Sequence, residues 1–512
     1  MSELKIGWAT RDVSTDKPVN IPGQFHMRIS KGVRDPLQVN ALVIEDGKDI
    51  VAFLSADLVV IRSGLLDEVR AKTAKLLKDF PVEKIIMNAT HSHTGASHYA
   101  DGKAWAATAS GSSTPVPARI PHEGIEIASS DEYRDFLSTQ AAEAIRDAYN
   151  TRAPGGIAYG YGYAVVGHSR RSIYFDDTSL RQGAVGGNGF RVDGHGVMYG
   201  NTNDENFSHY EAGADHFVNL LYTFDAQGKL SGAIINVPCP SQNSESDLRL
   251  SADYWHDVRV AITQRFGPIH LLPQCAAAGD LSPRILHYRK AQARRFKLKY
   301  GDGENSIHER KDIAERIADA FAEVFAWARK DIRRSLPITH VVKTVNLQRR
   351  LISDDELAFA QREYDRLKDE PFKTSGDTPQ NLLSHNSRLE AQRNRFQRII
   401  NRYADQKESP ALPMELHVLR IGDVAFATNR FELYMDYMHR IQARSPFAQT
   451  FVVQLTGVPG NDGGTYLATE RGAANKGYSA CLFCNMVSPE GGQQLVNETV
   501  AVLKDIYTED GA

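Results

Sequence analysis

Two histidines, His91 and His93, stand one residue apart in the segment NATHSHTG at positions 88–95. The run KIIM at 84–87 comes directly before it and predicts a buried strand that ends near the histidines. Because alternate side chains of an extended segment project to the same face, both imidazoles can reach one centre. There they could bind a metal together, or one could bind it while the other stabilises an oxyanion. His98 could contact a substrate at the same centre. The alternative is a set of polar loop histidines without a chemical role.

A carboxylate candidate, Glu432, closes the segment NRFE at 429–432, where a predicted strand gives way to a helix. Imidazole with carboxylate is the ligand set expected of a hydrolytic zinc site, which makes Glu432 a candidate metal ligand. An ordinary acidic residue in the first turn of a helix would explain this position equally well.

A third group of polar residues occurs in the segment GDLSPR at 279–284, which follows a predicted strand at 269–272. Its carboxylate and hydroxyl make Asp280 and Ser282 candidate catalytic residues, and Arg284 is a candidate for substrate binding. Helix capping alone also accounts for a Gly-Asp turn before Ser-Pro.

These motifs resemble those of the neutral ceramidases. THSHTG at 90–95 resembles that family's THTHSG, and GDLSPR at 279–284 resembles its GDVSP. The likeness extends to DPL at 35–37, to DHFVNLLYTF at 215–224 and to the region around Tyr466. The likeness therefore extends over most of a catalytic domain, but only short segments of it match.

The resemblance implies a mechanism as well as a fold. It implies that His91, Glu432 and Tyr466 bind zinc, and that Ser282 and His93 act beside a scissile amide. Zinc lowers the pKa of bound water and polarises a carbonyl, while a hydroxyl and an imidazole stabilise the developing oxyanion. Attack by zinc-bound water is the expected reaction, and a covalent serine nucleophile is the alternative.

One zinc ligand of that family is missing from the chain. Where the family has its second zinc histidine, in a segment like VHPTSMN, the chain reads VPCPSQN at 237–243, with Pro238 in place of the histidine. Cys239 could supply a ligand instead, His256 could reach the site, or the site could hold a metal poorly. Cys239 as a packed thiol is a further alternative. Gln242 is a candidate for substrate binding.

Three functions are compatible with these residues. The first is zinc-dependent hydrolysis of an amide or related bond in a small molecule, either a lipid amide or a hydroxylated, sugar-like compound. The second is cleavage of a glycosidic bond on the same scaffold, with His91, His93, Asp280 and Glu432 as acid, base or ligands. The third is a binding protein without a metal, which the Pro238 replacement favours. Clustered polar residues at several strand ends argue against this third function.

The apolar pattern predicts an α/β fold with a mixed β-sheet flanked by helices. Two hairpins, at 41–54 and 416–428, turn at Asp-Gly and Gly-Asp pairs, and we expect them to lie side by side in one sheet. Helical periodicity covers the segments 65–80, 132–149, 308–332, 355–368, 388–403 and 490–506.

We expect a single ceramidase-like catalytic domain over residues 1–512. A helical insertion at 353–407 would cap the site or mediate self-association into a homo-oligomer. Long loops at 95–130 and 178–211 are expected to form the rim of the site. Because the chain ends soon after Tyr466, we expect no C-terminal immunoglobulin-like domain of the kind these ceramidases carry.

The composition excludes several classes of partner. The chain has 60 Lys and Arg against 63 Asp and Glu, which offers no attraction for nucleic acid. The basic run at 284–299 predicts a solvated helical face. Without a signal-like start or an apolar stretch of spanning length, the protein is expected to be cytoplasmic and to have no membrane span. Four cysteines are too few for a disulfide framework, so we expect Cys481 and Cys484 to be buried or semi-buried thiols.

Overall fold

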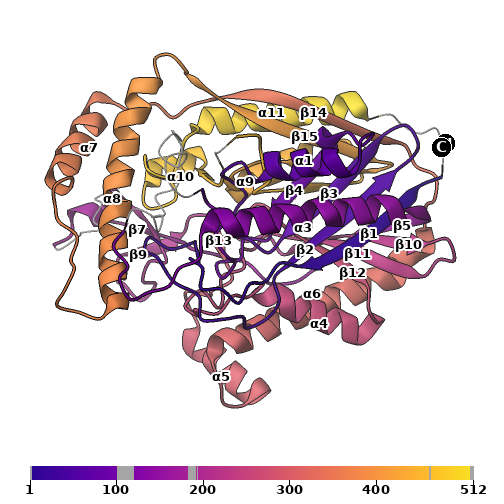
Figure 1. Ribbon diagram of the computed structural model, residues 1–512, viewed down its shortest axis with the longest axis horizontal. Coiled ribbons are helices and arrows are strands. Elements are labelled where there is room, and N and C mark those ends of the chain that lie inside the picture. The colour runs from indigo at the N-terminus through magenta and orange to yellow at the C-terminus, as the bar shows by residue number, and fades with distance from the viewer. Residues whose placement is uncertain (1–2, 101–119, 183–191, 193, 461–462, 508–512) are drawn as a thin grey trace.

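The computed structural model describes residues 3–100, 120–182, 192, 194–460 and 463–507. Two β-sheets lie face to face, and helices cover the outer face of each sheet (Figure 1). The predicted α/β fold, with a mixed sheet flanked by helices, is therefore confirmed.

The larger sheet has eight strands: β1 (Lys5–Asp12), β2 (Gln38–Glu45), β3 (Ile50–Ala56), β4 (Ile85–Ala89), β5 (Ala153–Tyr163), β10 (Phe217–Asp225), β11 (Leu230–Val237) and β12 (His270–Cys275). Their order is β12-β11-β10-β5-β1-β2-β3-β4. The pairs β3/β4 and β11/β12 are parallel, whereas the other pairs are antiparallel. The sheet is thus a mixed one.

The smaller sheet has the order β14-β15-β16-β18. Its strands are β14 (Ile338–Gln348), β15 (Ala411–Ile421), β16 (Val424–Thr428) and β18 (Gln449–Val453). Both predicted hairpins form, as β2–β3 and β15–β16. The expectation that they share one sheet is wrong, because each belongs to a different sheet.

The two hairpins instead pack face against face. Leu42 and Phe53 of the larger sheet share a buried cluster with Leu419 and Phe426 of the smaller one. The rings of Phe53 and Phe426 lie 4.9 Å apart. Strands that are apolar on both faces bury one face against helices and the other against a second sheet, so similar hairpins need not join edge to edge.

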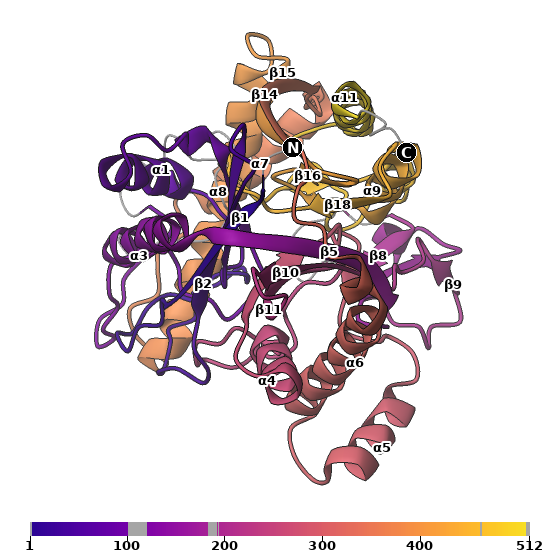
Figure 2. The same cartoon turned by 90° about the vertical axis from the view of Figure 1, so that its right-hand side faces the viewer.

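Helices cover the outer face of the larger sheet in two pairs. The pair α1 (Leu65–Leu76) and α3 (Ser130–Thr151) packs beside β1 to β4, and the pair α4 (Tyr254–Phe266) and α6 (Asn305–Ala328) packs beside β5 and β10 (Figure 2). The outer face of the smaller sheet is covered by α9 (Met435–Arg444) and α11 (Pro489–Ile506). No helix of the described chain is both long and apolar enough to span a membrane.

Helix α3 shows why these segments are helical. The Ser129 side chain accepts a hydrogen bond from the Asp131 amide and caps the first turn. Its buried apolar residues recur every three or four positions: Tyr133, Leu137, Ala141, Ala144, Ile145 and Ala148. This stripe faces the sheet, as helical periodicity predicts.

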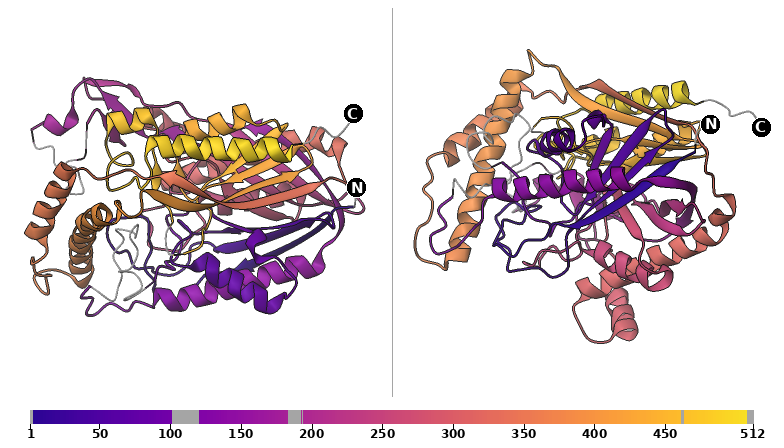
Figure 3. Two further views of the ribbon diagram at one scale, coloured as in Figure 1. Left: turned by 90° about the horizontal axis from the view of Figure 1, so that it is seen from above. Right: turned by 45° about the vertical axis from the view of Figure 1, so that its right-hand side comes forward.

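Two further helices, α7 (Asp354–Leu367) and α8 (Pro379–Asp405), occupy the predicted helical segment at 353–407 and stand together at one end of the molecule (Figure 3). Arg402 of α8 donates hydrogen bonds to the carbonyls of Leu482 and Asn485, which fixes α8 on the C-terminal part of the chain. That this pair caps the site or mediates self-association stays a prediction.

The remaining elements are short or peripheral. Helix α5 (Arg289–Tyr300) carries most of the basic run, and Phe296 alone of its residues is buried, so this part of the run is a solvated face. The prediction is wrong for Arg284, which lies before the helix and pairs with Glu245. The short strands are β6 (His168–Ser169), β7 (Arg171–Tyr174), β8 (Gly196–Met198), β9 (Phe207–Tyr210), β13 (Leu281–Ser282), β17 (Glu432–Leu433) and β19 (Tyr466–Leu467), and α10 (Glu470–Asn475) is a short helix. Because β7, β8 and β9 form a sheet, the segment 178–211 is not a plain loop as expected; strands of three or four residues give almost no periodic signal. Most of the expected loop at 95–130 lies outside the described residues.

Candidate functional site

The loops that follow β4, β11, β12 and β16 meet at the ends of the two sheets. Ser92 pairs with Ser241 through a backbone bridge, and the Gly279 amide donates to the Leu433 carbonyl. A Cβ at Gly279 would lie 2.4 Å from the Glu432 carbonyl oxygen, so only glycine permits this approach. The predicted placement of polar residues at strand ends thus brings four distant segments together.

His91 is buried and its ring is held by one backbone carbonyl. Its φ of 63° is uncommon for a residue other than glycine and turns the backbone sharply after β4. Nδ1 lies 2.6 Å from the Val59 carbonyl oxygen. Because a carbonyl only accepts, Nδ1 carries the proton and Nε2 is left with a lone pair in the neutral ring.

Glu432 faces that lone pair. Its Oε2 lies 3.4 Å from His91 Nε2. Burial alone would raise the pKa of Glu432, but His91 and then Arg170 outweigh burial and hold the pKa below its usual value. A carboxylate and a bare imidazole nitrogen both carry electron density, so a proton or a cation must lie between them.

Tyr466 and Arg170 complete this cluster. The paired backbones of β17 and β19 place Tyr466 beside Glu432. Arg170 Nη2 lies 3.2 Å from the Tyr466 hydroxyl and 3.6 Å from Glu432 Oε2, and it donates to the Gly279 carbonyl at 2.8 Å. Burial and the neighbouring Glu432 raise the pKa of Tyr466 well above its ordinary value, so its hydroxyl is protonated and can donate.

His93 belongs to a second cluster beside the first. Its Nδ1 lies 3.2 Å from Glu245 Oε2, and its ring centroid is 5.0 Å from that of His91. Glu245 also forms an ion pair with Arg284, whose Nη2 lies 2.6 Å from Glu245 Oε1. Although burial would raise the pKa of Glu245, His93 and Arg284 lower it to about 2. The Glu245 carboxylate is therefore charged, and it lies next to Nδ1 of the His93 ring, where it can pair with the imidazolium.

Ser282 is fully buried and lies next to Gln242. Gln242 Nε2 donates to Ser282 Oγ at 3.1 Å and also to the Tyr199 hydroxyl. The Arg284 amide donates to the same Oγ at 3.1 Å. Because Oγ accepts both bonds, neither of them uses the hydroxyl proton, which can be given to a substrate or a base.

The side chains of the other predicted residues, Asp280, His98 and Cys239, form their hydrogen bonds outside these two clusters. Asp280 Oδ1 accepts from the Met435 amide at 3.0 Å, where it caps α9, and burial raises its pKa to about 6. His98 accepts from the Arg62 amide, and burial followed by Arg62 lowers its pKa to about 3. The Cys239 thiol contacts the Pro240 carbonyl, and burial raises its pKa well above the ordinary value.

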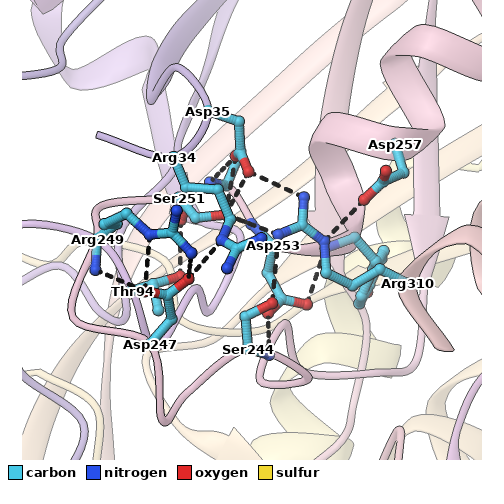
Figure 4. A network of polar contacts seen from close by, with 12 residues as sticks. Arg34, Asp35, Thr94, Ser244, Asp247, Arg249, Ser251, Asp253, Asp257 and Arg310 are labelled. Carbon is cyan, nitrogen blue, oxygen red and sulfur yellow. Dashed lines mark hydrogen bonds and ion pairs between the residues drawn. The ribbon is translucent and has the colours of Figure 1, made fainter. Parts of the chain in front are cut away.

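A buried ionic network is hydrogen-bonded to the segment that contains His91 and His93 (Figure 4). Arg310 pairs with Asp35 at 2.9 Å and with Asp257 at 2.7 Å, and it donates to Ser244 and Ser251. The Ser251 carbonyl accepts from the Thr94 hydroxyl at 2.9 Å. The network thus fixes Thr94, which follows His93, and Ser244, which precedes Glu245.

Comparison with solved structures identifies the fold. A neutral ceramidase from Pseudomonas aeruginosa aligns with a TM-score of 0.64 and 17% identity, covering 100% of this chain and 76% of that one. A ceramidase complexed with C2 aligns with a TM-score of 0.61 and 15% identity, covering 100% and 77%. The chain has the neutral ceramidase fold. No family model matches the sequence, and no curated protein matches it.

The predicted resemblance to neutral ceramidases is therefore confirmed at the level of the fold. Within this fold, His91, Glu432 and Tyr466 lie together. Two of the three predicted substrate contacts, Gln242 and Arg284, lie beside Ser282, and Arg284 also joins this group to His93 through Glu245. The third, His98, bonds to the Arg62 amide instead. In the described part of the chain no group of three or more His, Cys, Asp or Glu could hold a metal ion. A metal ion at this place would need a donor of another type beside His91 and Glu432, and the Tyr466 hydroxyl is the candidate.

The donor chemistry fits such an ion. His91 donates its Nδ1 proton to a backbone carbonyl, as metal-binding histidines usually do, and Nε2 faces a carboxylate. Three protein donors and one open position are the usual arrangement of a catalytic zinc site. The Cys239 thiol is directed at Pro240 instead.

Sequence reasoning missed Arg170, Glu245 and Tyr199. Arg170 and Arg171 are adjacent, and successive residues of an extended segment face opposite ways. Arg171 pairs with Glu211 at 2.6 Å, while Arg170 turns toward Glu432. The arginine doublet was the available signal, whereas the contact of Glu245 with His93 joins segments far apart in sequence and has no local signal.

Proposed function

We propose that this chain is a hydrolase of the neutral ceramidase type that cleaves an amide or related bond in a small molecule by attack of water. The observation that carries the proposal is the buried pair of His91 Nε2 and Glu432 Oε2, 3.4 Å apart. Such a pair calls for a proton or a cation between its members, and a metal ion is the cation that would also activate water. The neighbouring clusters supply a fixed imidazole, a free hydroxyl proton and a guanidinium.

A zinc ion at this place would be held by His91, Glu432 and Tyr466. When bound, zinc activates water and polarises a carbonyl group. Every other part of the chemistry belongs to side chains of the chain itself.

His93 is the candidate general base. With the proton on Nδ1, which lies 3.2 Å from the Glu245 carboxylate, Nε2 can accept a proton from an attacking water. Glu245 stabilises the imidazolium that results, and Arg284 keeps Glu245 charged. The same imidazolium can then return its proton to the leaving amine.

Arg170 and Ser282 are the candidates for stabilising the developing negative charge. Arg170 is buried, so its charge acts in a region of low dielectric constant. The Ser282 hydroxyl can donate to the substrate because both of its bonds to protein groups are accepted ones.

Hydrolysis of a short-chain N-acyl sphingosine, followed by release of the fatty acid, tests the proposal. We expect kcat/KM to fall about 100-fold or more in His93→Ala and in Ser282→Ala, because each removes a group that acts in the transition state. His209→Ala is the matched control, since His209 lies exposed in β9, and its activity should equal that of the wild type. Equal activity in all four proteins would contradict the assignment.

A further inference from the structure

Two thiols face each other in a turn shortly before α11. As predicted, Cys481 and Cys484 are buried thiols, and their Sγ atoms lie 3.6 Å apart. They are 6% and 8% exposed, whereas Cys239 and Cys275, the other two cysteines of the chain, have no exposed surface. Cys275 Sγ contacts the Cys239 carbonyl at 3.3 Å and not its thiol. Cys481 and Cys484 are therefore the pair that is arranged for a reaction between two thiols, and the more exposed pair.

The backbone of the turn holds the two thiols together. The Cys484 amide donates to the Cys481 carbonyl at 3.0 Å, which closes a four-residue turn. The hydrogen bond between the thiols outweighs burial and lowers the pKa of Cys481, while it raises the pKa of Cys484. Because the thiolate is the form that attacks an oxidant, Cys481 is the attacking sulfur. Sulfur atoms at this distance are farther apart than bonded ones, so the turn has to contract when a bond forms between them.

This turn is hydrogen-bonded to the strand that carries Tyr466. The Tyr466 amide donates to the Cys484 carbonyl at 3.1 Å. Asn485 Nδ2 donates to the Cys481 carbonyl at 3.3 Å, and Asn485 Oδ1 accepts from the Ala468 amide at 2.9 Å. These bonds connect the turn to the first residue of β19 and to the residue that follows β19. A contraction of the turn therefore shifts Tyr466, the third candidate donor for a metal ion.

We propose that Cys481 and Cys484 are a site of reversible oxidation, at which hydrogen peroxide closes a disulfide bond that displaces Tyr466. The Cys481 thiolate attacks one oxygen of the peroxide, the O–O bond breaks, and a sulfenic acid and hydroxide form. The Cys484 thiol then attacks the sulfenic sulfur and water leaves. One peroxide is thus reduced to two waters by two electrons and two protons from the thiols. A thiol such as glutathione reverses the reaction by exchange.

Peptide mass analysis of the full-length chain tests the oxidation. Both cysteines fall in one tryptic peptide, residues 477–504. After peroxide treatment and alkylation in denaturant, we expect this peptide to be unalkylated and lighter by two hydrogen atoms, whereas Cys239 and Cys275 should still be alkylated. Dithiothreitol should restore both thiols. Cys484→Ser should form no such disulfide, and Cys275→Ser, the matched control, should form it as the wild type does.

Hydrogen exchange measures the displacement without relying on activity. In the oxidised wild type, peptides that contain β19 should exchange faster than in the reduced protein, whereas those of α3 should be unchanged. Hydrolysis of the N-acyl sphingosine should fall about tenfold or more and recover with dithiothreitol, because a small misplacement of a group in the site is costly. Peroxide should produce neither effect in Cys484→Ser.

The effect on hydrolysis rests on the proposed function, because Tyr466 belongs to that site, but the two can fail separately. The inference is overturned if peroxide forms no disulfide in the wild type, if the disulfide leaves exchange in β19 unchanged, or if it leaves an active protein equally active. A disulfide that speeds exchange in β19 of a protein without hydrolase activity would overturn the proposed function alone.

Discussion

At the scale of single residues, the candidate site depends on close approaches between segments that are distant in sequence. His91 takes a positive φ to turn its ring toward Glu432, and Gly279 lets the backbone of Glu432 come near. Backbone strain of this kind persists only where the surroundings enforce it, and it is frequent at functional sites. The geometry of the donors is thus set by the backbone as much as by their side chains.

Gly279→Ala tests the importance of this approach. Its Cβ would lie 2.4 Å from the Glu432 carbonyl oxygen, so β17 must shift and displace the Glu432 carboxylate. We expect a loss of about 1–3 kcal/mol in the free energy of unfolding and a strong loss of hydrolysis. Urea denaturation and the N-acyl sphingosine assay measure the two effects.

Gly213→Ala is the matched control. Nothing lies within 4 Å of the Cβ that this substitution adds, so stability and activity should both stay at wild-type values. If Gly279→Ala behaves like this control, the close packing of the two segments has no part in holding Glu432.

At the scale of elements, a buried ionic network joins α6 to the loops that carry His93 and Glu245. Arg310 of α6 is 3% exposed and contacts Asp35, Asp257 and the serines at 244 and 251. Removing one partner of a buried pair leaves an uncompensated charge in the interior. The network therefore links the stability of the domain to the position of Glu245.

Arg310→Met should destabilise the protein by about 3–5 kcal/mol, because the buried Asp35 and the half-buried Asp257 lose their cation. Arg265→Met is the matched control: it breaks the exposed Arg265–Asp319 pair, which should cost less than about 1 kcal/mol. Chemical denaturation of both variants at neutral pH gives the comparison. Equal losses in the two variants would show that the buried network has no special importance.

At the scale of the whole molecule, two buried histidines lie where the smaller sheet meets the larger one. His340 Nε2 is 3.0 Å from His417 Nδ1, and His417 Nε2 is 3.0 Å from Glu415 Oε1. Burial, with help from the nearby cations Lys84 and Arg70, lowers the pKa of both histidines despite the Glu415 carboxylate. Both rings are therefore neutral in the folded protein at neutral pH.

This pair makes stability depend on pH. Above the unfolded pKa of about 6.5 neither state binds protons at these rings, whereas below it the unfolded state binds protons that the folded state refuses. Stability should therefore fall as pH drops from 7 toward 5, by up to about 1.4 kcal/mol per pH unit for each histidine. Urea denaturation at several pH values measures this slope. His340→Asn cannot titrate, so an equally steep slope in that variant would rule out His340 as a source.

Much of the fold could be predicted from local patterns, because each hairpin and long helix is specified by nearby residues. The helices at 65–76, 130–151 and 489–506 lie where periodicity placed them. The stacking of the two hairpins could not be predicted, since strands that are apolar on both faces do not specify which face meets which neighbour. The place of Arg170 and Glu245 in the site was not predicted for a similar reason, because their partners come from distant segments.

The metal content of the purified protein tests the central claim most directly. We would measure zinc per chain after saturation and dialysis in the wild type, His91→Ala, Glu432→Ala and the control His209→Ala. The account predicts about one zinc ion per chain in the wild type and the control, and its loss in both other variants, because a catalytic zinc site with three protein donors cannot spare one. A wild type that retains no zinc, or zinc that persists in both His91→Ala and Glu432→Ala, would contradict it.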